Sequence, residues 1–431
     1  MAEKRYGVLI AGTGVAGLCC ALSLPRETSV LLVSKAKADE SDSFLAQGGI
    51  YMLRGPEDFS GYFEDTMRAG HYENDEAAVR LMIESSPAMI ESLVRYGVEF
   101  ARDDAGRFRF TREGGHSRPR ILFHGDVTGK AITSCLLERV RELPNAVIAE
   151  ETELVDLLCT PGRGGECFGG VLRDNATGAL SAVYADAVLL ATGGVGGLFE
   201  NSTNFHHLTG DGVAIALKNG VEVEHLDYVQ IHPTTFYSEK GGRRFLISES
   251  VRGEGAVLLD KHGRRFCNEL MPRDVVTGDI RAQMQKDGTR HVWLDMRPVG
   301  AATLREHFPT ICAHCLEEGY DVLKDPIPVV PAQHYFMGGI KVDLDGRTSM
   351  RRLFAAGETA CNGVHGKNRL ASNSLLESLI WARRAAAAMA QLPAAGEGPA
   401  PDFAAYGDYA ALKQDYAKKV RDEAEREAYC D

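Results

Sequence analysis

A glycine motif between two apolar segments near the beginning of the chain most constrains its fold. Residues 6–11 (YGVLIA) are apolar enough for a buried strand, the motif GTGVAG follows at 12–17, and residues 29–34 (SVLLVS) form a second apolar segment. A strand, this motif, a short helix over 18–24 and a second strand are the fingerprint of a dinucleotide-binding fold. The glycines let backbone amides approach a pyrophosphate and let the helix pack close to the sheet. The sequence therefore predicts an α/β protein with a Rossmann-like nucleotide domain.

The end of the second apolar segment departs from this fingerprint. An Asp or Glu normally ends that strand and binds the ribose hydroxyls, whereas Ser34 and Lys35 stand here. Ser34 can still make one hydrogen bond. The departure argues against NAD as the bound nucleotide.

Two later segments repeat the strand-to-glycine pattern, at 187–194 (AVLLATGG) and 354–358 (FAAGE). Between them, the chain from about 226 to 340 changes to loops rich in His, Arg and Glu. We therefore expect a discontinuous nucleotide domain over 1–225 and 341–390, an inserted α+β capping domain over 226–340, and a short helical tail over 391–431. Turn signals also predict a β-meander over 145–185.

Size and charge exclude several classes of protein. A chain of 431 residues is expected to form two or three domains. Its 60 acidic and 48 basic residues give a formal charge of −12, which argues against a nucleic-acid-binding surface. We find no signal peptide and no apolar run near the roughly 20 residues of a membrane span. Ten scattered cysteines fit a reduced, cytoplasmic protein, and the single CxxC at 312–315 lacks the second pair of a zinc site, so no metal is predicted.

The segment HGKNRLASNSLLES, residues 365–378, reads as a polar loop that opens a helix from Ser374 to about Ala390. Asn373 or Ser374 is expected to cap this helix. Its free N–H groups would stabilise negative charge on a bound group. Arg369, just before the helix, has the planar fork that suits a carboxylate. An ordinary surface helix remains the alternative.

Four polar motifs mark the predicted capping domain: QIHPT (230–234), SESVRGEG (248–255), PRD (272–274) and HYFMGG (334–339). Each motif has a plain structural interpretation as well. His232 can cap a turn, His334 can be a core histidine, and Arg273 with Asp274 can be a solvated pair. Glu249 and Arg252 can form a helix-surface pair worth only about 0.3–0.5 kcal/mol. The combination of all four motifs favours a functional site.

The ordered motifs of the chain resemble those of the succinate dehydrogenase and fumarate reductase flavoprotein superfamily. They run over nearly the whole chain as GTGVAGL, AQGGI, TREGGHS, GDVTGK, ATGG, TGDG, IHPT, SESVRGEGA, PRD, HYFMGG, AAGE and HGKNRLASNSLLES. Within that superfamily, TREGGHS, GKNRLASNSLLE and Gln230 are most similar to the L-aspartate oxidase family.

This resemblance implies FAD as the cofactor. A histidine five residues before the glutamine of AQGG carries covalent flavin in the dehydrogenase relatives. Asp42 stands at that position here, so the resemblance implies non-covalent FAD. The residues expected to contact FAD are Gly12, Gly14, Val15, Ala16, Gly17, Ser34, Lys35, Gln47, Gly48, Gly49, Ala191, Thr192, Gly193, Asp211, Glu358, Ser374 and Leu375.

The resemblance also implies a reaction, the oxidation of L-aspartate to iminoaspartate with transfer of a hydride from Cα to flavin N5. The residues that match the carboxylate-binding positions of the family are Arg369, His232, His334 and Ser248. Glu113 and Gln230 match the positions that recognise the substrate ammonium group, which succinate lacks.

Arg273 matches the arginine that does acid–base work in this superfamily, with Glu249 and Arg252 as a proton relay to it. An arginine is an unusual base because its pKa normally lies above about 12. From the residues alone, Arg273 is better described as a third carboxylate clamp. Both roles stay open at this point.

The implied reaction is the first step of quinolinate and NAD biosynthesis, with quinolinate synthase as functional partner and oxygen or fumarate as electron acceptor. A soluble fumarate reductase is the nearest alternative. A non-catalytic flavin subunit for electron transfer is another, although Asp42 fits it poorly. Members of the oxidase family usually end in a longer helical domain, so residues 391–431 are expected to be a shortened form of it.

Overall fold

The computed structural model describes residues 4–162 and 164–428. Its largest sheet has seven strands in the order β5-β2-β1-β8-β7-β6, with β15 also paired to β8. Strands β1, β2, β5, β8 and β15 run parallel, so their carboxyl ends lie at one edge of the sheet. The strands are β1 (Lys4–Ala11), β2 (Val30–Val33), β5 (Ala146–Ala149), β6 (Thr152–Cys159), β7 (Cys167–Asp174), β8 (Leu180–Leu190) and β15 (Leu353–Ala355).

Strand β8 joins the parallel and antiparallel parts of this sheet. Its first residues pair antiparallel with β7, its last residues pair parallel with β15, and β1 pairs along its other side. The predicted β-meander over 145–185 is therefore only partly right. Strands β6, β7 and β8 form it, whereas β5 pairs with β2 at the far edge. The segment 187–191 is not a separate strand, because β8 runs unbroken to Leu190.

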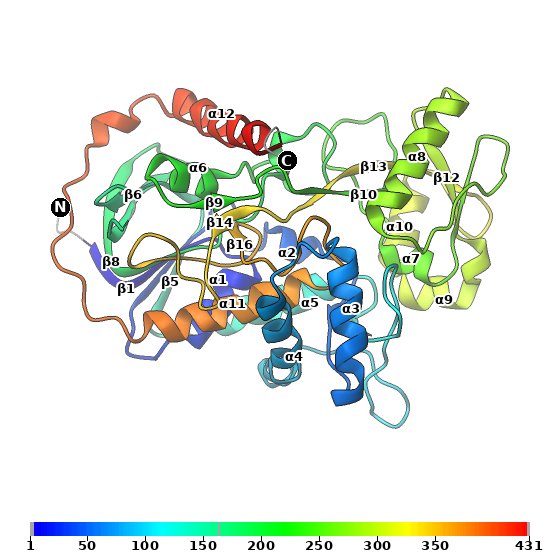
Figure 1. Cartoon of the computed structure of the whole chain (residues 1–431), viewed down its shortest axis with the longest axis horizontal. Coiled ribbons are helices and arrows are strands. Elements are labelled where there is room, and N and C mark those ends of the chain that lie inside the picture. The colour runs from blue at the N-terminus through cyan, green and yellow to red at the C-terminus, as the bar shows by residue number, and fades with distance from the viewer. Residues whose placement is uncertain (1–3, 163, 429–431) are drawn as a thin grey trace.

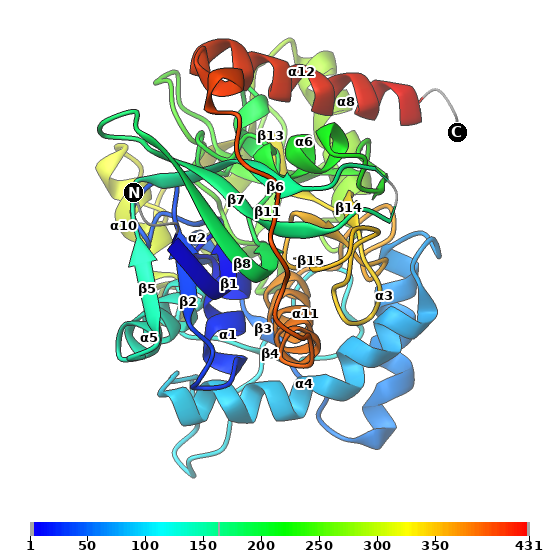
Figure 2. The ribbon, with the colours of Figure 1, turned by 90° about the vertical axis from the view of Figure 1, so that its left-hand side faces the viewer.

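The alternation of side chains along β1 divides the interior into two layers. Val8 and Ile10 face a core shared with α1 (Val15–Ser23), α4 (Glu76–Tyr96), α5 (Thr128–Arg141) and α11 (Ser374–Met389). Leu9 and Ala11 face the opposite core, which includes α6 (Asp211–Lys218) and α12 (Tyr409–Ala428). Figure 2 shows α12 on the α6 side of the sheet, away from α11. Helices on both faces of a largely parallel sheet confirm the predicted α/β fold.

A second sheet, in the order β10-β13-β12-β11, lies at the other end of the molecule (Figure 1). Its strands are β10 (Val229–Phe236), β11 (Val257–Leu259), β12 (Val292–Asp295) and β13 (Ile327–Phe336). The accompanying helices are α7 (Glu249–Gly253), α8 (Arg273–Asp287), α9 (Ala301–His307) and α10 (Pro309–Glu317). This region has its own cluster of buried apolar side chains, which spans Phe236 to Val329.

The chain enters and leaves this second region at adjacent points. Strand β9 (Val223–Glu224) pairs antiparallel with β14 (Gly339–Lys341), and β16 (Ala360–Cys361) pairs with β14. An inserted domain requires such neighbouring entry and exit points. The division at 226 and 340 stays a prediction, and we use "cap" below for residues 226–340.

Shorter elements complete the fold. They are α2 (Asp42–Leu45), β3 (Ile50–Tyr51), α3 (Phe59–Ala69), β4 (Ile121–Leu122), and 3-10 turns at Pro56–Asp58, Gly196–Leu198, Arg297–Val299 and Phe403–Tyr406. Within the described residues, every helix is too short or too polar to cross a membrane.

Candidate active site

A long cavity runs along the carboxyl ends of β1, β2, β8 and β15 and continues under the cap. Ligands of open α/β sheets bind at this edge. The empty space is about 1650 Å³, a figure that includes solvent at the mouth of the cavity. The lining extends from Ser34 and Asp211 beside the large sheet to His232 and Arg273 in the cap.

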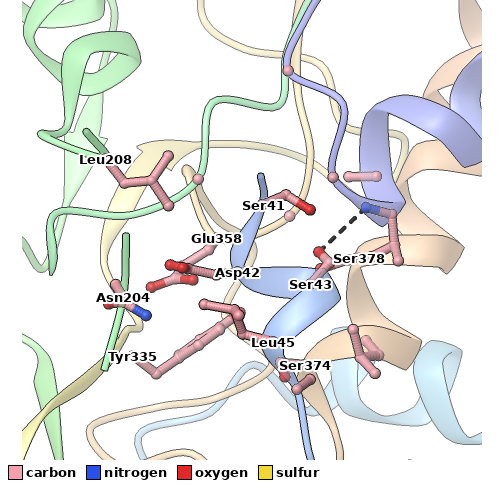
Figure 3. A pocket seen from close by; sticks show the side chains of 18 of the residues that line it. Ser41, Asp42, Ser43, Leu45, Asn204, Leu208, Tyr335, Glu358, Ser374 and Ser378 are labelled. Carbon is pink, nitrogen blue, oxygen red and sulfur yellow. Dashed lines mark hydrogen bonds between the residues drawn. The ribbon is translucent and has the colours of Figure 1, made fainter. Parts of the chain in front are cut away.

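The glycine motif forms one wall of this cavity. Gly12 has φ +118°, and a Cβ at that position would overlap the carbonyl oxygen of Ala191. Helix α1 starts at Val15 without a side-chain cap, although the Val15 N–H donates to the Ser43 hydroxyl (Figure 3). Gly17 does not line the cavity, because its Cα packs against the Gly12 carbonyl. The wall thus offers backbone donors to an anion, as a diphosphate requires.

The loop at 47–49 forms the middle of the cavity. A Cβ on Gly49 would overlap the Leu122 carbonyl, so only glycine fits there, and a Cβ on Gly48 would lie 2.7 Å from a Glu113 oxygen and displace that side chain. Six buried polar atoms of cavity-lining residues have no hydrogen-bond partner among the described residues: Ser41 Oγ, Asp42 Oδ2, Gln47 Oε1, Asn204 Oδ1, His232 Nε2 and Arg369 Nε. A flat, polar cofactor such as FAD fits this lining, because it can satisfy these groups.

Helix α11 begins at the cavity, at Ser374, as predicted. The predicted side-chain cap is wrong. Asn373 instead accepts a hydrogen bond from the Tyr62 hydroxyl and donates to Thr66 Oγ1, while Ser374 Oγ accepts from Arg369 at 3.1 Å. The first N–H groups of α11 thus keep no side-chain partner and remain available to a ligand.

Two carboxyl groups lie close together in the cavity, those of Asp42 and Glu358 (Figure 3). Burial raises the pKa of Asp42 to about 7, against the lowering effects of the Phe205 N–H and Arg243. Burial and then the Asp42 charge raise the pKa of Glu358 well above its ordinary value. The raised pKa favours the protonated form of Glu358, whose carboxyl group can donate a hydrogen bond to a ligand.

The cavity ends beyond β2. Ser34, Lys35 and Asp211 line it there, and Lys35 Nζ donates to Asp211 Oδ2 at 2.7 Å. Of the residues predicted to contact the cofactor, all except Gly17 line the cavity.

At the cap end, three charged groups form a continuous chain. Arg273 pairs through Nε with Glu249 Oε2, and Arg252 Nη2 lies 3.1 Å from Glu249 Oε1. Burial alone would raise the pKa of Glu249, but Arg252 and Arg273 outweigh it and hold the pKa below its ordinary value. The structure thus brings the predicted relay residues together, although Arg252 lies behind the cavity wall.

Arg369 and two histidines share the cap end with Arg273. Arg369 is buried, and among the described residues no carboxylate forms an ion pair with it. Burial and then Arg273 lower its pKa to about 10. The rings of His232 and His334 lie 5.0 Å apart, and burial followed by Arg273 lowers both of their pKa values well below the ordinary value. Both histidines are therefore neutral hydrogen-bonding groups near pH 7.

Glu113 links the cap to the loop before α11. It accepts hydrogen bonds from Ser250 Oγ at 2.8 Å and from Ser372 Oγ at 2.6 Å, and the Gly49 N–H donates to the same Ser372 oxygen. Burial raises its pKa against those two hydroxyls. Ser248, which caps the N-terminus of α7, also lines this part of the cavity.

Gln230 lies behind Arg273 and does not line the cavity. Its oxygen accepts from Arg273 Nη1 at 2.6 Å, and its amide donates to Asn368 Oδ1 and the Arg369 carbonyl. A direct contact with a substrate ammonium group would require release of Arg273. The predicted contact stays a prediction that this arrangement does not favour.

Among the cavity residues that were not predicted from the sequence, three contact the site residues described above. Tyr335 places its ring 4.3 Å from the Arg369 guanidinium carbon, Ser372 holds Glu113, and Arg243 faces Asp42. Tyr335 and Ser372 lie inside motifs already singled out, close to His334 and Ser374. Their place in those motifs could have identified them from the sequence. Arg243 stands in a glycine-rich loop with no motif around it.

Comparison with known proteins agrees with this geometry. A family model described as FAD binding domain matches residues 7–375. L-aspartate oxidase of Clostridium perfringens is 50% identical over 385 residues, which cover 89% of this chain and 86% of that protein. L-aspartate oxidase of Clostridium acetobutylicum is 45% identical over 88% of this chain and 86% of that protein.

Solved structures show the same architecture. A quinol-fumarate reductase with menaquinol molecules has a TM-score of 0.85 at 31% identity, over 96% of this chain and 75% of that chain. Mycobacterium smegmatis Sdh1 has a TM-score of 0.78 at 32% identity, over 96% of this chain and 73% of that chain.

Proposed function

Because the chain belongs to the L-aspartate oxidase family, we propose that it is an FAD-dependent enzyme that oxidises L-aspartate to iminoaspartate. The observation that carries the proposal is a pair of buried arginines, Arg273 and Arg369, at one end of the cavity with Glu113 beside them. L-aspartate carries two carboxylates and one ammonium group. The cap end of the cavity places two guanidinium groups, Arg369 and the Glu249-paired Arg273, beside the Glu113 carboxyl, which complements these charges.

Arg369 supports this proposal because no carboxylate of the described residues forms an ion pair with it. A buried guanidinium without a counter-ion is unfavourable, and a bound carboxylate would neutralise it. Its planar fork suits a carboxylate in two hydrogen bonds. Ser248, His232 and His334 then serve as neutral donors around the two carboxylates. Tyr335 holds the Arg369 side chain against one face of its ring.

The residues of the cap and of the α11 loop orient the substrate. When bound, FAD supplies the acceptor for the hydride that leaves the substrate Cα. When both carboxylates and the ammonium group are held, the Cα–H bond can point in only one direction in the cavity. Such orientation can lower the activation barrier by on the order of 7–11 kcal/mol at best. The cap covers this end and limits the access of water.

Arg273 has two candidate roles, and its contacts support both. As a clamp, it keeps donors for a substrate carboxylate while Glu249 and Gln230 fix its plane. As an acid–base group, it would exchange a proton with Glu249, and Glu249 with Arg252. The unbroken Arg273–Glu249–Arg252 chain favours the relay that the family resemblance implies. We propose Gln230 as a positioning residue for Arg273 and Arg369.

Glu113 is proposed to bind the substrate ammonium group. Its buried carboxyl faces the cavity and is held by two serine hydroxyls that do not neutralise it. A bound cation would lower its raised pKa and restore the carboxylate. Succinate has no such cation, so this residue distinguishes the amino acid from the plain diacid.

We propose that FAD is bound without a covalent link. Asp42 occupies the position expected of a flavin-linked histidine, and its carboxyl group accepts from the Phe205 N–H. Acid precipitation is therefore expected to release all flavin into the supernatant, as measured by fluorescence. Yellow, fluorescent protein that remains on a denaturing gel would contradict non-covalent binding.

The wider role follows from the same chemistry. Iminoaspartate is unstable in water, so we propose that quinolinate synthase consumes it, on the route to NAD, in the cytoplasm. Oxygen or fumarate is the proposed acceptor that regenerates the enzyme. Fumarate reduction is also the second candidate function, because the solved fumarate reductase superposes closely and the same arginines suit a dicarboxylate.

A product assay tests the proposed function. The purified protein with FAD, L-aspartate and oxygen should form iminoaspartate, which hydrolyses to oxaloacetate and ammonium, with hydrogen peroxide in equal amount. Omission of L-aspartate, or its replacement by D-aspartate, should abolish all of them. Fumarate reduction without any product from L-aspartate would favour the second candidate.

A further inference from the structure

Two lysines and two carboxylates meet at the end of the cavity beyond β2. Lys35 follows β2, Glu153 lies in β6, Asp211 begins α6 and Lys413 lies in α12. Lys35 Nζ lies 2.7 Å from Asp211 Oδ2 and 4.0 Å from Glu153 Oε2. Lys413 Nζ pairs with Asp211 Oδ1 and lies 3.7 Å from Glu153 Oε2. The four charges therefore balance one another.

This cluster lies at the nucleotide end of the site. The residue after the second strand holds the ribose in dinucleotide folds, and that residue is normally acidic. Ser34 and Lys35 replace it here, so the carboxylates of this end come from Glu153 and Asp211, which both line the cavity. Burial alone would raise the pKa of Asp211, but Lys35 and Lys413 outweigh it and hold the pKa below its ordinary value.

Helix α12 reaches this cluster because apolar packing holds it on α6 and β6. Tyr416 and Val420 are buried in the core beneath it, and the Tyr416 hydroxyl donates to the Val155 carbonyl at 2.6 Å. Tyr409, one turn before Lys413, donates to Glu153 Oε1, and its ring lies 4.0 Å from the Arg173 guanidinium carbon. Two residues of α12 thus orient one carboxylate of the cavity.

We propose that helix α12 belongs to the FAD site and that Lys413 is a positioning residue for the adenosine half of the cofactor. Lys413 does not line the cavity itself. It acts through Glu153 and Asp211, which it orients toward the ribose end. Without it, two carboxylates would face one lysine, and the excess negative charge would lie near the diphosphate of FAD.

The test is the FAD affinity of the full-length Lys413→Met holoenzyme, measured from flavin fluorescence released on dilution. We expect the Kd for FAD to rise about tenfold, which corresponds to about 1.4 kcal/mol. FMN lacks the adenosine half of FAD. The Kd of the Lys413→Met protein for FMN should therefore stay within twofold of the Kd of the parent protein for FMN. Lys413→Arg keeps the charge and should restore most of the FAD affinity.

Two control variants separate this role from helix docking. Lys419→Met removes a partly exposed lysine of the same helix whose Nζ lies 3.4 Å from Asp415 Oδ1, and it should leave FAD affinity unchanged. Val420→Ala weakens the packing of α12, so it should lower the Tm with little change in the Kd for FAD.

Three results would overturn the proposal: an unchanged Kd for FAD in Lys413→Met, an equal loss of FMN affinity, or an equal loss of FAD affinity in Val420→Ala. The proposal rests on FAD binding and not on the substrate. A Lys413→Met protein that binds FAD weakly but still oxidises L-aspartate when saturated with FAD would leave the proposed function intact. A parent protein that binds FAD normally but does not oxidise L-aspartate would contradict the proposed function and leave the proposal for Lys413 untouched.

Discussion

The Arg273→Lys enzyme is expected to oxidise L-aspartate with a kcat lower by about 10²–10⁴-fold, the range of a lost acid–base group. Lysine keeps the charge but cannot hold Glu249 with one nitrogen and Gln230 with another while it also faces the substrate. The proton path to Arg252 would be broken at its first member. Initial rates of hydrogen peroxide formation over a range of L-aspartate concentrations measure the effect.

The division between kcat and KM separates the two roles of Arg273. A relay role predicts that kcat falls while KM changes little, whereas a clamp role predicts that KM rises as much as kcat falls. Arg281→Lys, at an exposed position of the same helix, is the matched control and should behave like the parent. Activity of Arg273→Lys within twofold of the parent would refute both roles.

The Glu113→Gln enzyme is expected to lose at least about 100-fold in kcat/KM for L-aspartate and to keep its rate of fumarate reduction within a few-fold. Glutamine has nearly the same shape and can keep hydrogen bonds to Ser250 and Ser372, so the change removes only the charge that would meet the ammonium group. Truncating one partner of a buried charge pair costs about 2–5 kcal/mol. Both reactions are followed in one preparation, with L-aspartate and oxygen or with fumarate and a reductant.

The exposed Glu84→Gln variant on α4 is the control for loss of a carboxylate elsewhere. If Glu113→Gln lowers both reactions equally, Glu113 does not recognise the ammonium group. Its contribution would then be to the geometry that both reactions share.

Local patterns predicted the elements that hold the cofactor. The strand, GTGVAG motif, helix and strand of residues 4–33 were predicted because glycine spacing and apolar runs act within a short segment. The helix from Ser374 was predicted from its apolar and alanine positions, and it ends at Met389. The motifs that the resemblance rests on contain most of the cavity-lining residues of the cap, but not Arg243.

Contacts between distant segments were not predicted. The pairing of β5 with β2, instead of with its sequence neighbour β6, depends on the whole sheet. Asn373 occupies the N-cap position of α11, but its side chain does not cap the helix because Tyr62 and Thr66, more than 300 residues earlier in the chain, offer it hydrogen bonds. Lys413 lies beside Asp211 at the nucleotide end of the cavity because α12 packs on α6. No pattern within residues 391–431 indicates this position.

The most direct test of the central claim is anaerobic mixing of the yellow holoenzyme with L-aspartate, followed by flavin absorbance near its visible maximum. We predict rapid loss of the visible band with L-aspartate, none with succinate or D-aspartate on the same timescale, and return of the band on addition of fumarate or air. A band that persists with L-aspartate, in a protein whose dithionite-reduced form is reoxidised by fumarate, would contradict aspartate oxidation and identify a fumarate reductase.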